Sequence, residues 1–234
     1  MDKLIKILIV NIVITACLIS RISGEALNLQ CTSEPYVPVG TTYIRYGRTV
    51  CPDTADLVYS GVLAGAKGAG IQSAPESGYG NEEPGGGSNY LCLTNTPQFD
   101  QSVPGQQDSR ARLYAAEYRS GEAGALQQYH TYDAPCAVCQ SREGRTQSFM
   151  MPATVQCPTG WTTEYNGYLA AARWNHPRTQ HVCLDRNPEI ISGTKSVNPR
   201  SAISYLFQVE VGSDSGLPPA YETGDDLTCA ICTM

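Results

Sequence analysis

The sequence has no surplus of positive charge and few charged residues of either sign. Asp, Glu, Lys and Arg make up 16% of the 234 residues, and the formal net charge is −6. A nucleic-acid-binding surface needs clustered Lys and Arg to neutralise phosphates, so we expect no nucleic-acid partner. Phenylalanine is scarce, with three residues, whereas Gly (22), Pro (15) and Tyr (14) are abundant. This balance favours short strands and turns over long helices.

Motifs of the common catalytic and metal sites are also missing. The three histidines, His130, His176 and His181, do not form an H-E-x-x-H pattern, and no G-x-S-x-G elbow, P-loop or dinucleotide fingerprint occurs. We therefore expect no catalytic residue, no metal and no cofactor. An enzyme is the alternative, and it would rest on the histidines or on Glu117 and Glu210, which could form a carboxylate pair of the glycosidase type.

The one long apolar stretch lies at the N-terminus and is too short to cross a membrane. Lys3 and Lys6 precede an apolar run from Ile7 to Ile19, whereas a spanning helix needs about 20 apolar residues. We interpret residues 1–24 as a secretory signal, and we expect a secreted, extracellular chain without a membrane partner. Its removal takes away three basic residues and one acidic residue, which changes the net charge from −6 to −8.

Cysteine is abundant, with ten residues, of which Cys17 lies in the signal. An oxidising compartment should pair most of the other nine. Because nine is odd, at least one is free or bonded to another chain. Cys31, in the N-terminal segment 25–40, is the candidate for an interchain bond, and a free or capped thiol is the alternative.

The two C-x-x-C motifs belong to a longer internal repeat. The matched blocks follow one another in the same order in each half; they are "RTVCPDTADLVYSGVLAGA" (48–66) with "ATVQCPTGWTTEYNGYLAAA" (153–172), "SNYLCLTNTP" (88–97) with "TQHVCLDRNP" (179–188), and "APCAVCQ" with "LTCAICT". Glu117 and Glu210 fall at equivalent positions of a further block. We predict an internal duplication, with one subdomain in residues 41–140 and a second in residues 146–234.

Most of the matched blocks have the pattern of strands. "NYLCLT" alternates between two faces, and "YLFQVEVG" is rich in β-branched and aromatic residues. The predicted fold is all-β, with two tandem disulfide-linked β-rich subdomains. The first half carries an insertion at 66–88, which its Gly, Pro and Ser content marks as a surface loop.

Three roles are open to the C-x-x-C motifs. A zinc site would need four thiolates, but the pairs of a zinc ribbon lie about 15–20 residues apart, and the second motif here begins far from the first. A redox pair would open a helix, and neither motif has a helix signal after it. Structural disulfides are the third role, and four cysteines in each half allow three pairings. Each bridge would contribute roughly 4 kcal/mol by closing a long loop.

A family resemblance is carried by "TTYIRYGRTVCP", "GGGSNYLCL", "APCAVC", "CPTGWTTEYNGYLAAARWNHPRTQHVCLD" and "DLTCAICT". Together they resemble the head domain of the short-chain, spongin-type collagens and, more remotely, the non-collagenous C-terminal domain of type IV collagen, over about residues 41 to 234. The resemblance implies four disulfides: Cys51–Cys139, Cys92–Cys136, Cys157–Cys232 and Cys183–Cys229. The sequence has no Gly-X-Y run, so it would be a head domain without a triple helix.

Signal, repeat and resemblance lead to one functional hypothesis. We expect a secreted, non-enzymatic structural or assembly protein of the extracellular matrix, which associates with itself or with matrix proteins. Association with a mineral is a variant that the negative charge permits. The alternative is a carbohydrate-binding or defence module that binds glycans through aromatic side chains, namely Trp161, Trp174, Tyr165 and Tyr168.

Overall fold

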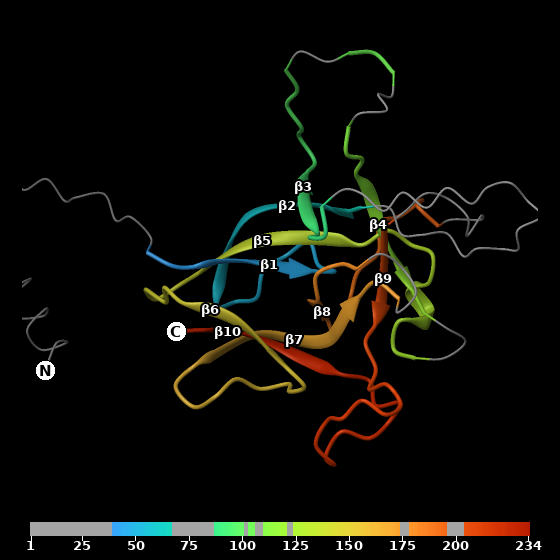
Figure 1. The fold of residues 1–234 in the computed structure, drawn as a ribbon. Coiled ribbons are helices and arrows are strands. Elements are labelled where there is room, and N and C mark those ends of the chain that lie inside the picture. Colours follow the sequence, from blue (N-terminus) through green and yellow to red (C-terminus); the bar gives the residue numbers. More distant parts are fainter. Residues whose placement is uncertain are drawn as a thin grey trace, which may run out of the picture. The chain divides into compact units, whose positions relative to one another are not determined.

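The computed structural model describes residues 39–66, 87–100, 103–105, 110–120, 124–173, 178–195 and 204–234. These residues contain ten strands and one 3₁₀ helix (Figure 1). The strands are β1 (Thr42–Tyr46), β2 (Ala55–Gly65), β3 (Leu91–Thr94), β4 (Tyr114–Arg119), β5 (Pro135–Ser141), β6 (Ser148–Pro152), β7 (Thr162–Ala171), β8 (Val182–Asp185), β9 (Ser204–Gln208) and β10 (Thr228–Thr233), and the 3₁₀ helix is Gln127–Tyr129. The all-β prediction is confirmed.

Several predictions fall outside the described residues. They concern the signal, Cys31 and most of the N-terminal segment, nearly all of the insertion at 66–88, and both Trp174 and His176. Residues Val39–Met234 form one compact unit.

All ten strands belong to one mixed sheet. Its order is β6-β10-β7-β8-β1-β5-β2-β4-β9, with β3 beside β2 and a further pairing between β7 and β9. The path from β7 through β8, β1, β5, β2, β4 and β9 therefore returns to β7. Two pairs are parallel, β1 with β8 and β4 with β9, and both join a strand of the first predicted repeat to a strand of the second.

The two C-x-x-C motifs lie in interior strands. β5 runs between β1 and β2, and β10 runs between β6 and β7, so both edges of each strand are hydrogen-bonded. Their small and β-branched residues suit this position, because cysteine, alanine, valine and isoleucine fill narrow spaces without adding polar groups. β10 is buried along nearly its whole length.

The first five strands and the last five have matching neighbours. β5 lies between β1 and β2, just as β10 lies between β6 and β7. β2 also pairs with β3 and β4, just as β7 pairs with β8 and β9. The registers agree, since Arg45 of β1 and Met151 of β6 both face an alanine. Each long strand also has a register shift, or β-bulge, at the same place. The residue without a pairing partner, which we call the skipped residue, is Val58 in β2 and Glu164 in β7.

One pairing breaks this correspondence. β1 pairs with β8, but no pairing joins their equivalents, β6 and β3, among the described strands. Within the described ranges, β6 pairs with β10 alone and β3 pairs with β2 alone.

The buried core also draws on both predicted repeats. One cluster joins Leu63 and Tyr118 to Leu184 and Leu206, and a second joins Tyr43 to Tyr165 and several cysteines. The polar stretch 141–148, at the boundary between the two predicted subdomains, holds the buried Arg145.

Candidate functional site

Four disulfides join remote segments of the chain, and they are the same four pairs that the resemblance implies. They are Cys51–Cys139, Cys92–Cys136, Cys157–Cys232 and Cys183–Cys229, with sequence separations of 88, 44, 75 and 46. Neither C-x-x-C motif is closed on itself, and every cysteine in the described ranges is disulfide-bonded. Four disulfides indicate an oxidising environment.

The two halves meet at a surface that we call the intrachain joint, formed by residues 42–49 on one side and residues 182–189 on the other. Tyr46 pairs with Leu184, and the Glu189 amide donates to the Gly47 carbonyl at 2.7 Å. Gly47 has a φ of +88°, and a Cβ there would lie 2.8 Å from a methyl group of Leu184. A glycine is therefore needed for this close approach.

Ion pairs hold the intrachain joint at two positions. The Arg45 guanidinium lies 2.7 Å from the Asp185 carboxylate, and both side chains are largely buried. The Arg48 guanidinium lies 3.1 Å from Glu189, which also accepts a hydrogen bond from the Thr49 hydroxyl at 2.7 Å. Arg45 and Asp185 are shielded from solvent, so their attraction is stronger than that of an exposed pair.

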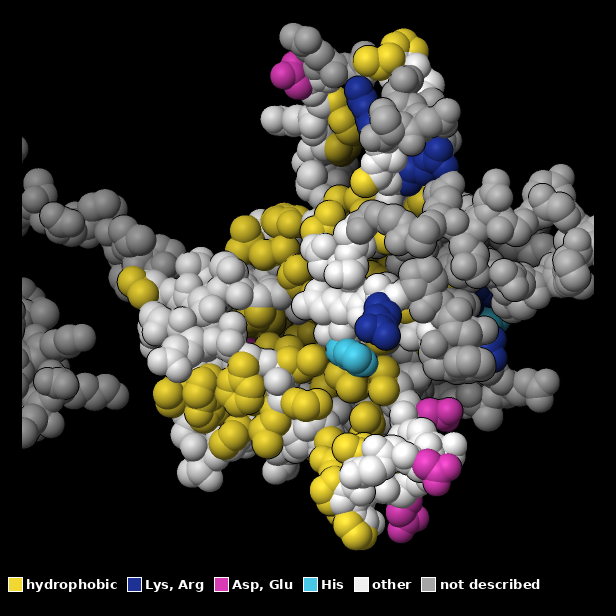
Figure 2. All heavy atoms as spheres, viewed as in Figure 1, with side chains coloured by type: hydrophobic (Ala, Val, Ile, Leu, Met, Phe, Trp, Pro, Cys, Tyr) yellow, Lys and Arg dark blue, Asp and Glu magenta, His cyan; other side chains and the backbone are white. Residues whose placement is uncertain are grey.

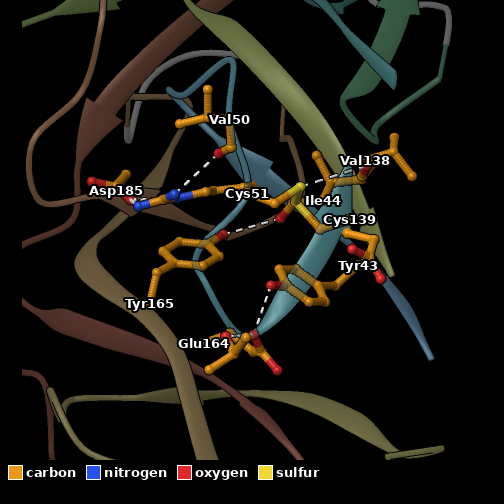
Figure 3. The surroundings of a disulfide bond; sticks show 12 residues. Tyr43, Ile44, Val50, Cys51, Val138, Cys139, Glu164, Tyr165 and Asp185 are labelled. Atoms are coloured by element: carbon orange, nitrogen blue, oxygen red, sulfur yellow. Dashed lines mark hydrogen bonds and ion pairs between the residues drawn. A yellow bond between two sulfur atoms is a disulfide. The ribbon is translucent and has the colours of Figure 1, made fainter. Parts of the chain in front are cut away.

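Tyr165, in β7, contacts both sides of the intrachain joint (Figure 3). Its hydroxyl lies 3.0 Å from the Ile44 carbonyl and 2.9 Å from the Cys183 carbonyl, and so it connects a strand of each half. The Arg45 guanidinium lies 5.6 Å from the centre of its ring. Burial raises the pKa of Tyr165 well above the ordinary value, so the hydroxyl stays protonated and remains a donor.

Glu164, the skipped residue of β7, carries a buried carboxylate that four donors satisfy. These are the hydroxyls of Tyr43 at 2.9 Å, Thr54 and Thr233, and the Arg145 guanidinium at 3.1 Å. A bulge redirects a side chain in this way, and in Figure 3 Tyr43 points at Glu164. Burial alone would raise the pKa of Glu164, but the three hydroxyl hydrogen bonds and the charge of Arg145 outweigh it and lower the pKa. The carboxylate therefore stays ionised.

The surfaces equivalent to the intrachain joint are exposed. We call them the open counterpart: residues 148–155 on one side and residues 91–98 on the other. Leu93 is 39% exposed where its equivalent Leu184 is fully buried, and Tyr59 is 37% exposed where Tyr165 is 5% exposed. Tyr59 keeps one of the two hydrogen bonds of Tyr165, since its hydroxyl donates to the Cys92 carbonyl at 2.9 Å.

A cavity of about 210 Å³ lies between β1, β6, β8 and β10. Its apolar walls come from both sides of the boundary between the halves, chiefly Tyr43, Ile44, Phe149, Met150, Val182 and Ile231. The exposed His181 also lines it. Phe149 meets Trp161 edge to face at 4.7 Å between ring centres. Figure 2 shows hydrophobic side chains gathered over this part of the surface, around β6 and the connection to β7.

The acidic residues that the sequence singled out have different surroundings. Glu117 is fully buried and forms an ion pair with Arg119 at 2.7 Å, whereas Glu210 is exposed. Their positions are equivalent, as predicted, because Glu117 bridges to Asp133 and Glu210 to Asp226. Burial raises the pKa of Glu117, opposed by the charge of Arg119. The structure places neither of them on the walls of the cavity.

The aromatic residues proposed to bind sugars are only partly accessible. Tyr165 is buried in the intrachain joint and has no face for a sugar. Trp161 is half-buried against Phe149, and Tyr168 is half-buried with the Arg186 guanidinium 6.0 Å from its ring centre.

Comparisons and further searches give three findings. A scan against protein-family models matches none of them to this chain. Within the described ranges, no group of three or more His, Cys, Asp or Glu side chains is placed to hold a metal ion. In the same part of the chain, no helix has the length and apolar character that a membrane crossing requires.

Two buried residues beside the intrachain joint, Glu164 and Arg145, could not be predicted from the sequence. Glu164 lies in "TTEYNG", where its neighbours are polar, and nothing in that pattern distinguishes a buried carboxylate from an exposed one. Arg145 lies in a short polar stretch that favours solvent exposure. One signal in the sequence could have pointed to Glu164. It aligns with the apolar Val58, so the two predicted repeats differ in polarity at this position.

Proposed function

We propose that this protein is a secreted, non-enzymatic structural protein of the extracellular matrix whose copies join head to tail. In this proposal the chain consists of two copies of one disulfide-linked β unit, at 41–140 and 146–234. It functions like a collagen head domain, as the resemblance implies, and association with a mineral is a variant.

The observation that carries the proposal is the unmatched pairing in the sheet. β1 of the first half pairs with β8 of the second, while β6 and β3, which are equivalent to them, each keep an edge without a strand partner among the described residues. An unpaired edge presents a row of backbone donors and acceptors to another strand. We infer that β6 of one molecule lies beside β3 of the next, as β1 lies beside β8.

Side chains of the open counterpart support the same arrangement. Leu91 and Leu93 of β3 are exposed, and so is Phe149 of β6. Contiguous exposed apolar surface marks interaction sites on soluble proteins. The Tyr59 hydroxyl would find its second acceptor in the Met150 carbonyl of the neighbouring molecule, since Met150 is equivalent to Ile44.

Such an interface uses different surfaces on the two partners. Each molecule offers one β6 edge and one β3 edge, so that every added copy leaves one of each kind available. Interfaces of this type produce closed rings when the rotation closes and filaments when it does not. Either product suits a structural role.

The test is the mass of the secreted, unreduced chain in solution over a range of concentrations, measured by sedimentation velocity. We expect self-association in the wild type and its loss in Leu93→Lys, which adds a charge to the β3 edge. Leu217→Lys, at an exposed leucine in the turn after β9, is the matched control and should associate like the wild type. A wild-type chain that stays monomeric at every concentration would refute the proposal.

A glycan-binding module is the second candidate. The observation in its favour is the pair Phe149 and Trp161 beside the cavity of about 210 Å³, because aromatic faces stack on sugar rings. A glycan array separates the candidates: binding that Trp161→Ala abolishes supports the glycan function, and no binding to any glycan removes it.

A further inference from the structure

We infer that three pairs of facing side chains decide which strand docks on which surface. In the intrachain joint each pair contains at least one charged group, whereas the equivalent pairs of the open counterpart are uncharged. The inference rests on the proposed self-association and names the residues that give it specificity. A chain with two similar strands and two similar docking surfaces needs such a rule, because β1 and β6 could otherwise exchange places.

The first position is the ion pair of Arg45 with Asp185. Register places Met151 at the site of Arg45 and Thr94 at the site of Asp185, since Gly61 pairs with Thr94 as Gly167 pairs with Asp185. The charged pair thus becomes a thioether and a hydroxyl. Met151 would lie over the ring of Tyr59, as Arg45 lies over Tyr165 at 5.6 Å, and a thioether beside an aromatic ring is a favourable contact.

The second position is the hydrogen bond from Tyr43 to Glu164. Phe149 is equivalent to Tyr43, and Val58 is equivalent to Glu164, because both are the skipped residues of their strands. The polar pair becomes an apolar pair. Both of its members are exposed, Val58 by 54% and Phe149 by 39%, so each has surface to bury against the other.

The third position lies in the loops that follow the strands. Arg48 pairs with Glu189 in the intrachain joint at 3.1 Å. Counting on from the equivalent strand residues Tyr46 and Pro152 places Thr154 at the site of Arg48, and Gly47 and Ala153 between them both have positive φ. Counting on from Asp185 and Thr94 places Gln98 at the site of Glu189. Two opposite charges again become two uncharged polar groups.

An exchanged strand would leave charges buried without partners. β1 on the β3 surface would place Arg45 against Thr94 and the Tyr43 hydroxyl against Val58. β6 on the β8 surface would place Met151 against the buried carboxylate of Asp185, which would lose Arg45, and Phe149 against the carboxylate of Glu164. Leaving a buried charge unpaired is strongly unfavourable, and unpaired groups against the wrong partner are a general source of specificity. Each strand therefore rejects the other surface, and closure within one chain leaves the open counterpart available to a second chain.

The experiment introduces the charged pair of the intrachain joint into the open counterpart. Met151→Arg and Thr94→Asp are made separately and together in the full mature chain, and the dissociation constant for self-association is measured by sedimentation. We expect each single variant to bind at least about 100-fold more weakly, because each buries one unpaired charge, and the double variant to recover to within about tenfold of the wild type. Leu217→Arg and Ser215→Asp, in an exposed turn, control for added charge.

The outcomes separate this inference from the function on which it rests. A monomeric wild type overturns both. A wild type that associates, with single variants of unchanged affinity, overturns only the specificity rule. Weakened single variants without recovery in the double variant place the interface at these residues but also overturn the rule. Unfolding midpoints of all variants, measured in parallel, must match the wild type, because neither Met151 nor Thr94 belongs to the two core clusters.

Discussion

Glu164 gives the sharpest test of how the two halves are held together. Glu164→Gln keeps the size of the side chain but removes its charge and turns one acceptor oxygen into a donor. Four donors face this carboxylate, and one of them is the Arg145 guanidinium. The hydroxyls can rotate to accept, but Arg145 loses its counter-charge in a buried site.

The expected loss is about 3 kcal/mol of unfolding free energy at pH 7. Removing one partner of a buried, hydrogen-bonded ion pair costs about 3–5 kcal/mol, and Gln retains one oxygen, which favours the lower figure. A domain has roughly 5–15 kcal/mol in total, so the change is large. Guanidinium unfolding with intact disulfides measures it as a shift of the midpoint. Glu210→Gln, at the exposed Glu210, is the control and should not move the midpoint.

The pH dependence gives an independent check. In the folded protein, despite burial, hydrogen bonds from three hydroxyls and the charge of Arg145 hold the pKa of Glu164 below the ordinary value of a glutamate. The stabilisation by its carboxylate is therefore fully present above the unfolded-state pKa and is lost as the pH falls through the folded-state pKa. The deficit of Glu164→Gln should shrink on acidification from pH 7 to about pH 3. Equal midpoints at pH 7, or a deficit that does not change with pH, would refute the reasoning.

Two further changes test the disulfides and the close approach of the strands. The double variant Cys157→Ser with Cys232→Ser opens a loop with a sequence separation of 75 and should lower the unfolding free energy by about 4 kcal/mol; an unchanged denaturation midpoint would contradict this. Gly167→Ala places a Cβ 1.7 Å from the Leu184 carbonyl oxygen, so β8 must move and the melting temperature should fall sharply. Gly212→Ala, with no atom within 4 Å, should melt like the wild type, and equal melting of the two variants would show that β7 and β8 are not this close.

The strands could be predicted from the sequence because their signals are local. Alternation identified β3, and the "APCAVCQ" and "LTCAICT" blocks are β5 and β10. The repeat also revealed equivalent positions, such as Gly61 and Gly167, each of which lies against a leucine carbonyl. Such regularities depend on a few neighbouring residues, so a single sequence contains them.

The joining of the two halves could not be predicted in the same way. Arg45 and Asp185 are separated by 140 residues, and neither has a local pattern that names its partner. Glu164 is buried only because a bulge turns it toward Tyr43, and a one-residue irregularity leaves no mark on composition. The differences between the predicted repeats carried this information, since charges in one half stand where the other half has neutral residues.

Placement of β6 beside β3 of a neighbouring molecule is the central claim, and disulfide trapping tests it most directly. Pro152 and Leu93 are equivalent to Tyr46 and Leu184, which pair in the intrachain joint, so cysteines at these sites would lie within bonding distance. Pro152→Cys and Leu93→Cys chains, each also carrying Cys31→Ser, are mixed under mild oxidation. The account predicts covalent dimers that contain one chain of each kind. Mixtures that remain monomeric, or that form only like-with-like dimers, would contradict it.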